Sequence, residues 1–414
     1  MSTAEIKEMH EQYVMPTYAP GLALVKGEGS KVWDAEGNEY LDFLAGIAVT
    51  NIGHAHPKFL AAVNEQARKL VHVSNLYFNE KQPELAKALV ERADLGGGKV
   101  FFCNSGAEAN EGLIKLARYW GKDCGRYEII TMNKSFHGRT LATLTATGQE
   151  KVQKGFAPLP EGFVYADFND IESVKAACTD QTAAVMVEAI QGEGGVNPAD
   201  PEFLAELRAF CDEKGILLLI DEVQCGMGRT GRWFGFQNYN LKPDAFSLAK
   251  GLGNGYPIGA VVAGPKLQDV FQPGAHATTF GGTPLACAAA LSVVDVIEEE
   301  NLLTHAMIMG AFLMEGLCAI AQKNKKWVSS VRGIGLIVGL VLDVPALPLQ
   351  QKLQEKGLLS IATAGNVLRV LPPLNVTQDE VEQALKLIDE ACAEIYDEMA
   401  ELSPTPCKCP REEA

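Results

Sequence analysis

The sequence has no excess of basic residues. Among its 414 residues, 36 are Lys or Arg and 52 are Asp or Glu, so the formal net charge is −16. Nucleic acids and anionic membrane surfaces are bound by basic faces. We therefore expect neither a nucleic acid nor a membrane as a partner.

The sequence also lacks the features of an exported or membrane protein. We expect no apolar stretch long enough to span a bilayer. The N-terminal residues do not combine a basic start with an apolar core, so we predict no signal peptide. The ten cysteines are scattered through apolar segments, as at Cys103 and Cys211, and are expected to be reduced core thiols. A cytoplasmic protein is expected.

The middle of the chain alternates short apolar runs with helix-like segments. Unbroken apolar runs are typical of strands buried on both faces, as in a mostly parallel sheet covered by helices. Ligands of such sheets bind at the carboxyl ends of the strands. Cys103, Glu188, Asp221 and Ala249 lie at such ends. We expect strands at 99–103, 127–131, 183–188, 216–221, 244–249 and 259–263, and helices at 108–120 and 201–214.

The two flanks differ from the middle. A hairpin with its turn at Glu36–Asn38 is predicted near the N-terminus. Strands at 335–342 and 367–371 and one helix at 378–399 are predicted near the C-terminus. The fold class is thus α/β, with a large domain and a smaller α+β domain built from both chain ends. We expect the small domain at 1–52 and 311–402, the large domain at 53–310, and a disordered tail at 403–414.

Lys250 and Asp221 form the most informative pair. Each follows a predicted buried strand, and glycines follow the lysine. Pyridoxal phosphate chemistry needs a lysine that condenses with the cofactor aldehyde and an acid that keeps the pyridine nitrogen protonated. A lysine at a strand end does not establish this chemistry by itself.

Other motifs are ambiguous when each is taken alone. Asn104–Asn110 follows a strand and opens a helix, so it predicts either a phosphate site or an ordinary capped helix with Ser105 and Glu108 at capping-box spacing. Phe136 could stack on a cofactor ring and Arg139 could clamp a carboxylate, or they could be a core ring and a surface charge.

The acidic, glycine and histidine motifs also leave alternatives open. Glu188 and Glu193 could be general acids, metal ligands or solvated acids. The glycines at 251–255 fit a dinucleotide fingerprint poorly. His54 and His56 have no third ligand at suitable spacing, so we predict no metal site.

In combination, these motifs resemble the class III (subgroup II) aminotransferases, which are fold-type I pyridoxal phosphate enzymes. The resemblance runs from about residue 18 to 400 and is closest to acetylornithine aminotransferases. The ordered motifs are Gly53–Pro57, Asn104–Asn110, Phe136–Arg139, Gln191–Gly195, Asp221–Gly231, Ala249–Gly255 and Thr278–Gly282.

The resemblance implies roles around the cofactor. Lys250 would condense with the aldehyde and carry the transferred proton, and Asp221 would pair with the ring nitrogen. Val223 and Phe136 would cover the two ring faces. The remaining cofactor contacts would be Gln224 and Glu188 near the phenolic oxygen, and Ser105, Gly106, Ala107 and Thr279 at the phosphate.

The resemblance also implies a homodimer with shared active sites, because Thr279 would complete the phosphate site of the neighbouring subunit. Arg139 would bind the far carboxylate of the amino donor. Arg369 would bind the α-carboxylate of glutamate or 2-oxoglutarate. Glu193 would neutralise Arg369 while the amino donor is bound and would swing away when glutamate or 2-oxoglutarate binds.

The expected reaction is transfer of the amine of N2-acetyl-L-ornithine to 2-oxoglutarate in arginine biosynthesis. Phe78 stands where ornithine aminotransferases have a tyrosine, which favours an acylated donor, and Tyr18 would contact the substrate carboxylate. Ala189 and Thr283 replace a usual proline and asparagine near the site. A succinylornithine, ornithine or 4-aminobutyrate aminotransferase stays open.

Two other classes of function remain as alternatives. A nucleotide-binding oxidoreductase would use the glycine-rich stretches, although their spacing is poor. A catalytically silent binding protein of the same family is opposed by the presence together of Lys250, Asp221, Arg139 and Arg369.

Overall fold

The computed structural model describes residues 1–402, and a seven-stranded sheet is its centre. The sheet order is β4-β12-β11-β10-β7-β5-β6. The strands from β11 to β6 are parallel, whereas β12 runs antiparallel to both of its neighbours, so the predicted mostly parallel sheet is confirmed. The strands are β4 Lys99–Cys103, β5 Glu128–Met132, β6 Phe163–Ala166, β7 Thr182–Glu188, β10 Leu217–Asp221, β11 Ala245–Leu248 and β12 Gly259–Ala263.

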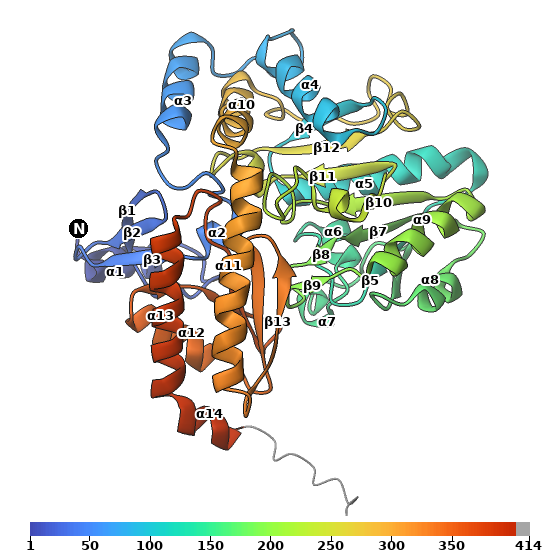
Figure 1. Cartoon of the computed structure of the whole chain (residues 1–414). Coiled ribbons are helices and arrows are strands. Elements are labelled where there is room, and N and C mark those ends of the chain that lie inside the picture. The colour runs from blue at the N-terminus through green and yellow to red at the C-terminus, as the bar shows by residue number, and fades with distance from the viewer. Residues whose placement is uncertain (403–414) are drawn as a thin grey trace, which may run out of the picture.

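Helices cover the central sheet in layers (Figure 1). Helix α5 packs on β12, β11, β7 and β10, while α9 packs on β10 and α8 on β6. Helix α9 has a proline in its first turn, as predicted, and it ends at Gly215, which lies in the left-handed region. These helices and their neighbours are α3 Pro57–Lys69, α4 Lys81–Ala93, α5 Gly106–Gly121, α8 Ile171–Ala177, α9 Pro201–Lys214 and α10 Pro284–Glu299.

Two four-stranded sheets lie beside this layer. The order of one is β1-β2-β3-β15, and its predicted hairpin between β2 and β3 is confirmed. Because β15 pairs with β3, residues from both chain ends share this sheet. The order of the other is β13-β14-β17-β16. The strands are β1 Leu24–Glu28, β2 Lys31–Asp34, β3 Glu39–Asp42, β13 Val328–Ile334, β14 Ile337–Leu342, β15 Leu358–Leu359, β16 Ile361–Thr363 and β17 Val367–Val370.

The remaining elements are mostly short, and the predicted division into domains stays a prediction. The single helix expected at 378–399 is wrong, because the chain forms α13 and α14 with Ile395 between them. These elements are α1 Thr3–Tyr13, α2 Ala45–Ala48, α6 Leu141–Ala146, α7 Glu150–Gln153, β8 Ile190–Gln191, β9 Asn197–Pro198, α11 Leu302–Lys323, α12 Leu347–Glu355, α13 Gln378–Glu394, α14 Tyr396–Leu402 and the 3-10 turns η1 Lys122–Cys124, η2 Gly235–Tyr239 and η3 Lys250–Leu252.

Helix α11 corrects the expectation about apolar length. By length and composition it is the one helix of residues 1–402 that could cross a membrane. Its inner face packs against β13, β14 and α13 and buries Leu313 and Leu317. A core helix of a globular protein passes the same test of length and composition.

The expectation of core thiols is only partly correct. Cys103 and Cys211 are buried, but Cys124 and Cys318 are exposed. The expected disordered tail, with its own cysteines, lies outside the described residues.

Candidate active site

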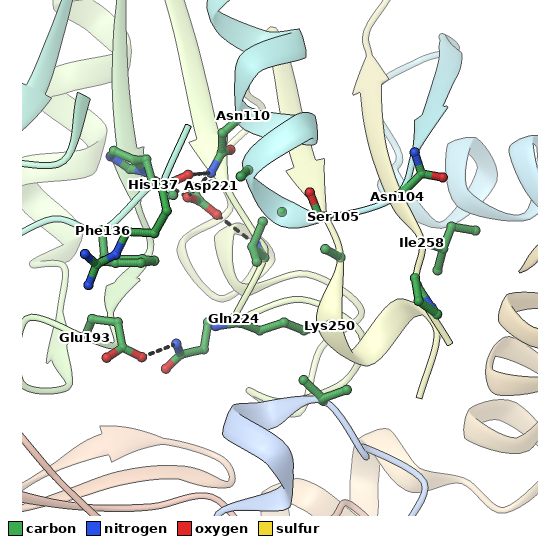
Figure 2. A pocket seen from close by; sticks show the side chains of 18 of the residues that line it. Asn104, Ser105, Asn110, Phe136, His137, Glu193, Asp221, Gln224, Lys250 and Ile258 are labelled. Carbon is green, nitrogen blue, oxygen red and sulfur yellow. Dashed lines mark hydrogen bonds and ion pairs between the residues drawn. The ribbon is translucent and has the colours of Figure 1, made fainter. Parts of the chain in front are cut away.

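A cavity of about 380 Å³ opens at the carboxyl ends of the central strands. Lys250, just after β11, and Asp221, at the end of β10, both line it (Figure 2). The structure therefore brings together the pair that the sequence singled out. The other expected site residues that line the cavity are Ser105, Gly106, Ala107, Phe136, Arg139, Glu188, Glu193, Val223 and Gln224.

Lys250 occupies an unusual backbone position. Its φ of 45° lies in the left-handed region, where a non-glycine residue is strained. Burial lowers the pKa of the Lys250 ammonium, and the Arg369 guanidinium adds to this shift, although the Glu193 carboxylate opposes it. A lowered pKa increases the fraction of neutral amine, which is the nucleophilic form.

Asp221 is held by several donors. Its Oδ2 accepts hydrogen bonds from Asn110 Nδ2 at 2.7 Å and His137 Nδ1 at 2.8 Å. Its Oδ1 accepts from the amide of Val223 at 2.9 Å. The carboxylate is 4% exposed, so these donors fix its direction.

Sequence reasoning gave no role to Asn110 or His137. Asn110 lies one helical turn after Gly106, and this spacing places the two residues on the same face of α5. That spacing could have identified Asn110 as a site residue. His137 gave no such indication, since its contact with Asp221 depends on how the loop after β5 meets the end of β10.

Glu188 is a second buried carboxyl group at this edge. Burial raises the pKa of Glu188 well above its ordinary value, and the Asp221 carboxylate raises it further. The amide of Phe136 donates to Glu188 Oε2 at 3.3 Å and partly opposes the shift. A protonated Glu188 could therefore donate a hydrogen bond into the cavity.

Glu193 and Arg369 form an ion pair beside the cavity. Arg369 NH1 donates to Glu193 Oε1 at 2.7 Å and to Gln224 Oε1 at 3.0 Å. Although burial alone would raise the pKa of Glu193, Arg369 and Lys250 outweigh this effect and lower it. Arg369 is fully buried, and its Nε and NH2 have no partner among the described residues. This guanidinium therefore retains N–H groups that can donate hydrogen bonds to a substrate carboxylate.

The start of α5 forms a small cradle. Ser105 Oγ accepts from the amide of Glu108 at 3.2 Å, but the Glu108 carboxylate accepts from the amide of Asn104 instead of that of Ser105. Only half of the predicted capping box therefore forms. A Cβ at Gly106 would lie 2.7 Å from Val223 Cγ1, so any larger residue here would require Val223 or the helix start to shift. First-turn amides are free to bind an anion.

The cavity as a whole fits pyridoxal phosphate. It offers anion-binding amides at a helix start, the side chains of Phe136 and Val223, an acid at Asp221 and an amine at Lys250. These groups suit a phosphate, an aromatic ring, a ring nitrogen and an aldehyde, respectively.

Three expected site residues do not line the cavity that contains Lys250. Tyr18 is 85% exposed, and Phe78 and Thr279 are also exposed. Phe78 and Thr279 line a second cavity of about 1350 Å³. Asn104 lines both cavities, so the two spaces adjoin at the start of α5.

The described residues contain no cluster of three or more His, Cys, Asp or Glu side chains that could hold a metal ion. His54 pairs with Asp42 at 2.7 Å, and His56 pairs with Glu300 at 3.0 Å. The two histidines thus face different carboxylates instead of sharing a ligand position.

Comparison with known proteins agrees with this site. The model of the class III aminotransferases matches residues 14–392. The chain is 51% identical to an acetylornithine aminotransferase of Caldanaerobacter subterraneus subsp. tengcongensis, over 93% of this chain and 98% of the relative.

Two solved structures are also similar. The ornithine aminotransferase of Toxoplasma gondii has a TM-score of 0.92 and 34% identity, with 96% of each chain covered. The N-acetylornithine aminotransferase of Stenotrophomonas maltophilia has a TM-score of 0.81 and 36% identity, covering 94% of this chain and 99% of its own. The chain therefore belongs to the class III aminotransferases and is a pyridoxal phosphate-dependent enzyme.

Proposed function

We propose that this enzyme transfers the δ-amine of N2-acetyl-L-ornithine to 2-oxoglutarate and forms N-acetyl-L-glutamate 5-semialdehyde and L-glutamate in arginine biosynthesis. The observation that carries the proposal is the placement of two arginines. Arg139 is exposed at the cavity and lies 5.6 Å from the Phe136 ring, whereas Arg369 is fully buried beside Glu193. Two guanidinium groups at different depths suit two substrates whose carboxylates lie at different distances from the transferred amine.

The cofactor supplies an aldehyde that takes up the amine and a ring that draws electrons from the neighbouring carbon. Lys250 Nζ moves the proton away from that carbon. Asp221 is oriented by Asn110 and His137 and would hold a proton on the ring nitrogen. Phe136 and Val223 would hold the ring between them and limit its contact with water.

The remaining cofactor contacts lie at the edges of the ring. Ser105, Gly106 and Ala107 bind the phosphate at the helix start. Gln224 and the protonated Glu188 would hold the phenolic oxygen of the cofactor. The amino donor and 2-oxoglutarate use the same cavity. The first product must therefore leave before the second substrate binds, which gives a ping-pong cycle.

Glu193 acts as the gate between the two substrates. While the acylated donor is bound, Glu193 neutralises Arg369, because an unpaired buried guanidinium is costly. When glutamate or 2-oxoglutarate enters, its α-carboxylate replaces Glu193 on Arg369.

The catalytic unit in this proposal is a cytoplasmic homodimer with shared active sites. Thr279 is exposed in the second cavity and is free to complete the phosphate site of a neighbouring subunit. Leu76, Phe78 and Phe280 are also exposed there, and a subunit interface would bury this apolar surface. Tyr18 and Phe78 would reach the donor from this interface.

Gly106→Ala tests the phosphate cradle. The new methyl group would lie too close to Val223 Cγ1, so the helix start must shift. We expect cofactor affinity to fall about tenfold, because overpacking costs about 1–3 kcal/mol. Titration of the cofactor-free enzyme with pyridoxal phosphate measures this change. Gly125→Ala is a matched control, because its added Cβ meets no neighbour, although its positive φ costs some stability. Equal affinities in both variants would remove Gly106 from the cradle.

A donor panel tests the substrate. We expect kcat/KM for acetylornithine to exceed that for ornithine and for 4-aminobutyrate by about 100-fold, because those donors lack the acylated α-amine that the site accommodates. Phe78→Tyr should narrow the gap for ornithine by restoring a hydroxyl. Succinylornithine serves as the comparison for acyl size. If ornithine gives the highest kcat/KM of the panel, the result would favour ornithine aminotransferase activity, which is the activity named for the Toxoplasma gondii structure.

A further inference from the structure

Arg229 is a buried cation that forms no ion pair within residues 1–402. It lies in the loop after β10 and is fully buried. No carboxylate of the described residues forms an ion pair with Arg229, although the Asp42 carboxylate partly offsets the lowering of its pKa by burial. The Nε of Arg229 has no hydrogen-bond partner in this part of the chain. A buried guanidinium without a counter-charge is costly, so the groups that it does bind should explain its place in the fold.

The guanidinium joins three segments that are far apart in the sequence. Its NH1 donates to the backbone carbonyls of Leu336, at 3.1 Å, and Pro372. Its NH2 donates to Asn51 Oδ1 at 2.6 Å. The backbone carbonyl of Arg229 also accepts from the amide of Leu336 at 3.0 Å. The loop after β10 is thereby tied to the start of β14 and to the segment after β17.

The hydrogen bonds of Arg229 replace part of the backbone ladder between β14 and β17. Strands β14 and β17 pair antiparallel, with Val338 opposite Val370 and Gly339 opposite Arg369. The same register, extended by two residues, would place Leu336 opposite Pro372. Proline has no N–H to donate, so the ladder cannot continue there in the ordinary way. Arg229 instead donates to both carbonyls and holds the end of β17, which is the strand that carries Arg369.

Asn51 extends the tie toward Lys250. Its Nδ2 donates to the carbonyl of Met227 at 2.9 Å, and its own carbonyl accepts from the amide of Leu374 at 2.7 Å. A Cβ on Gly251 would lie only 2.3 Å from Asn51 Nδ2, so this side chain packs directly on the residue that follows Lys250. One continuous set of contacts thus runs from Lys250 to β17.

We infer that Arg229 is a positioning residue for the second substrate. By fixing the end of β17 against the loop after β10, Arg229 sets where the Arg369 guanidinium lies relative to Lys250. The same loop carries Gln224, which accepts from Arg369 NH1 at 3.0 Å. Arg229 therefore governs binding of the α-carboxylate of glutamate and 2-oxoglutarate. Arg139 comes from the segment after β5, outside this network, so its proposed contact with the donor carboxylate should not depend on Arg229.

The test separates the two half-reactions of the holoenzyme. Arg229→Lys keeps the charge but cannot reach all three acceptors. We expect the KM for 2-oxoglutarate and the dissociation constant for glutamate to rise about tenfold, since a displacement of about 1 Å can cost that much or more. The acetylornithine half-reaction should stay within about twofold of the wild type. Equal losses in both half-reactions, or no change in either, would overturn the inference.

Two further variants keep the test decisive. Asn51→Ser is milder, because Arg229 keeps both carbonyl bonds. It should shift the glutamate half-reaction in the same direction by about threefold, so it decides the matter if Arg229→Lys does not fold. Arg232→Lys is the matched control, since Arg232 is an exposed arginine of the same loop and its variant should change neither half-reaction.

The inference depends on the proposed role of Arg369, and Arg369→Leu separates the two claims. If Arg369→Leu spares the glutamate half-reaction, the proposed function of Arg369 fails. If Arg369→Leu impairs that half-reaction but Arg229→Lys does not, only the inference about Arg229 fails.

Discussion

Lys250→Ala abolishes turnover. We expect kcat to fall by about 10⁴-fold or more, because the variant loses both the amine that binds the cofactor and the group that moves the proton. Pyridoxal phosphate should still bind through the helix start and Asp221, but without the absorbance of the lysine-linked cofactor. Steady-state kinetics and the visible spectrum of the purified protein measure both effects.

Two controls accompany this variant. Lys250→Arg keeps a positive charge but offers no amine that condenses with an aldehyde, so it should be as inactive as the alanine variant. Lys151→Ala replaces an exposed lysine of α7 and should keep wild-type activity. Retention of the lysine-linked absorbance in Lys250→Ala would show that another residue binds the cofactor.

Asp221→Asn should lower kcat by about 10³-fold, which is the loss expected when a preorganised charge at a reacting group is removed. The physical reason is specific to this site. Asn110 and His137 both donate to Asp221 Oδ2, and an asparagine amide nitrogen at that position would meet these donors with another donor. The side chain must then rotate or leave a buried donor unpaired, which costs about 1–3 kcal/mol.

Single-turnover measurement of the proton transfer isolates this effect from substrate binding. Asp221→Glu keeps the charge and should retain more activity than Asp221→Asn. Asp180→Asn, at an exposed aspartate before β7, should behave as the wild type. If the rate of Asp221→Asn stays within about tenfold of the wild-type rate, Asp221 is not an essential partner of the ring nitrogen.

Much of the fold and half of the site were predictable from local patterns. The apolar runs before Cys103, Glu188 and Asp221 are strands of one sheet, because runs buried on both faces leave few alternatives. Their carboxyl ends share an edge, and this brings Lys250 and Asp221 to one cavity. Family membership excludes the nucleotide-binding oxidoreductase that the glycines at 251–255 had left open.

The remainder depends on contacts between distant segments. The bond from His137 to Asp221 joins a loop to the end of β10, and the bonds of Arg229 join it to Leu336 and Pro372. No periodicity in the sequence encodes such contacts between distant segments. The ion pair of Glu193 with Arg369 was expected only from the resemblance. Tyr18, Phe78 and Thr279 do not reach the cavity within one chain, so their proposed roles require a second subunit.

The most direct test of the account follows the nitrogen itself. The holoenzyme is incubated with N2-acetyl-L-ornithine labelled with ¹⁵N at the δ position and with unlabelled 2-oxoglutarate, and the products are read by mass spectrometry. The account predicts ¹⁵N-glutamate and N-acetylglutamate semialdehyde in equal amounts, and neither product with Lys250→Ala. Semialdehyde formed without labelled glutamate, or no consumption of acetylornithine by an enzyme that converts ornithine, would contradict it.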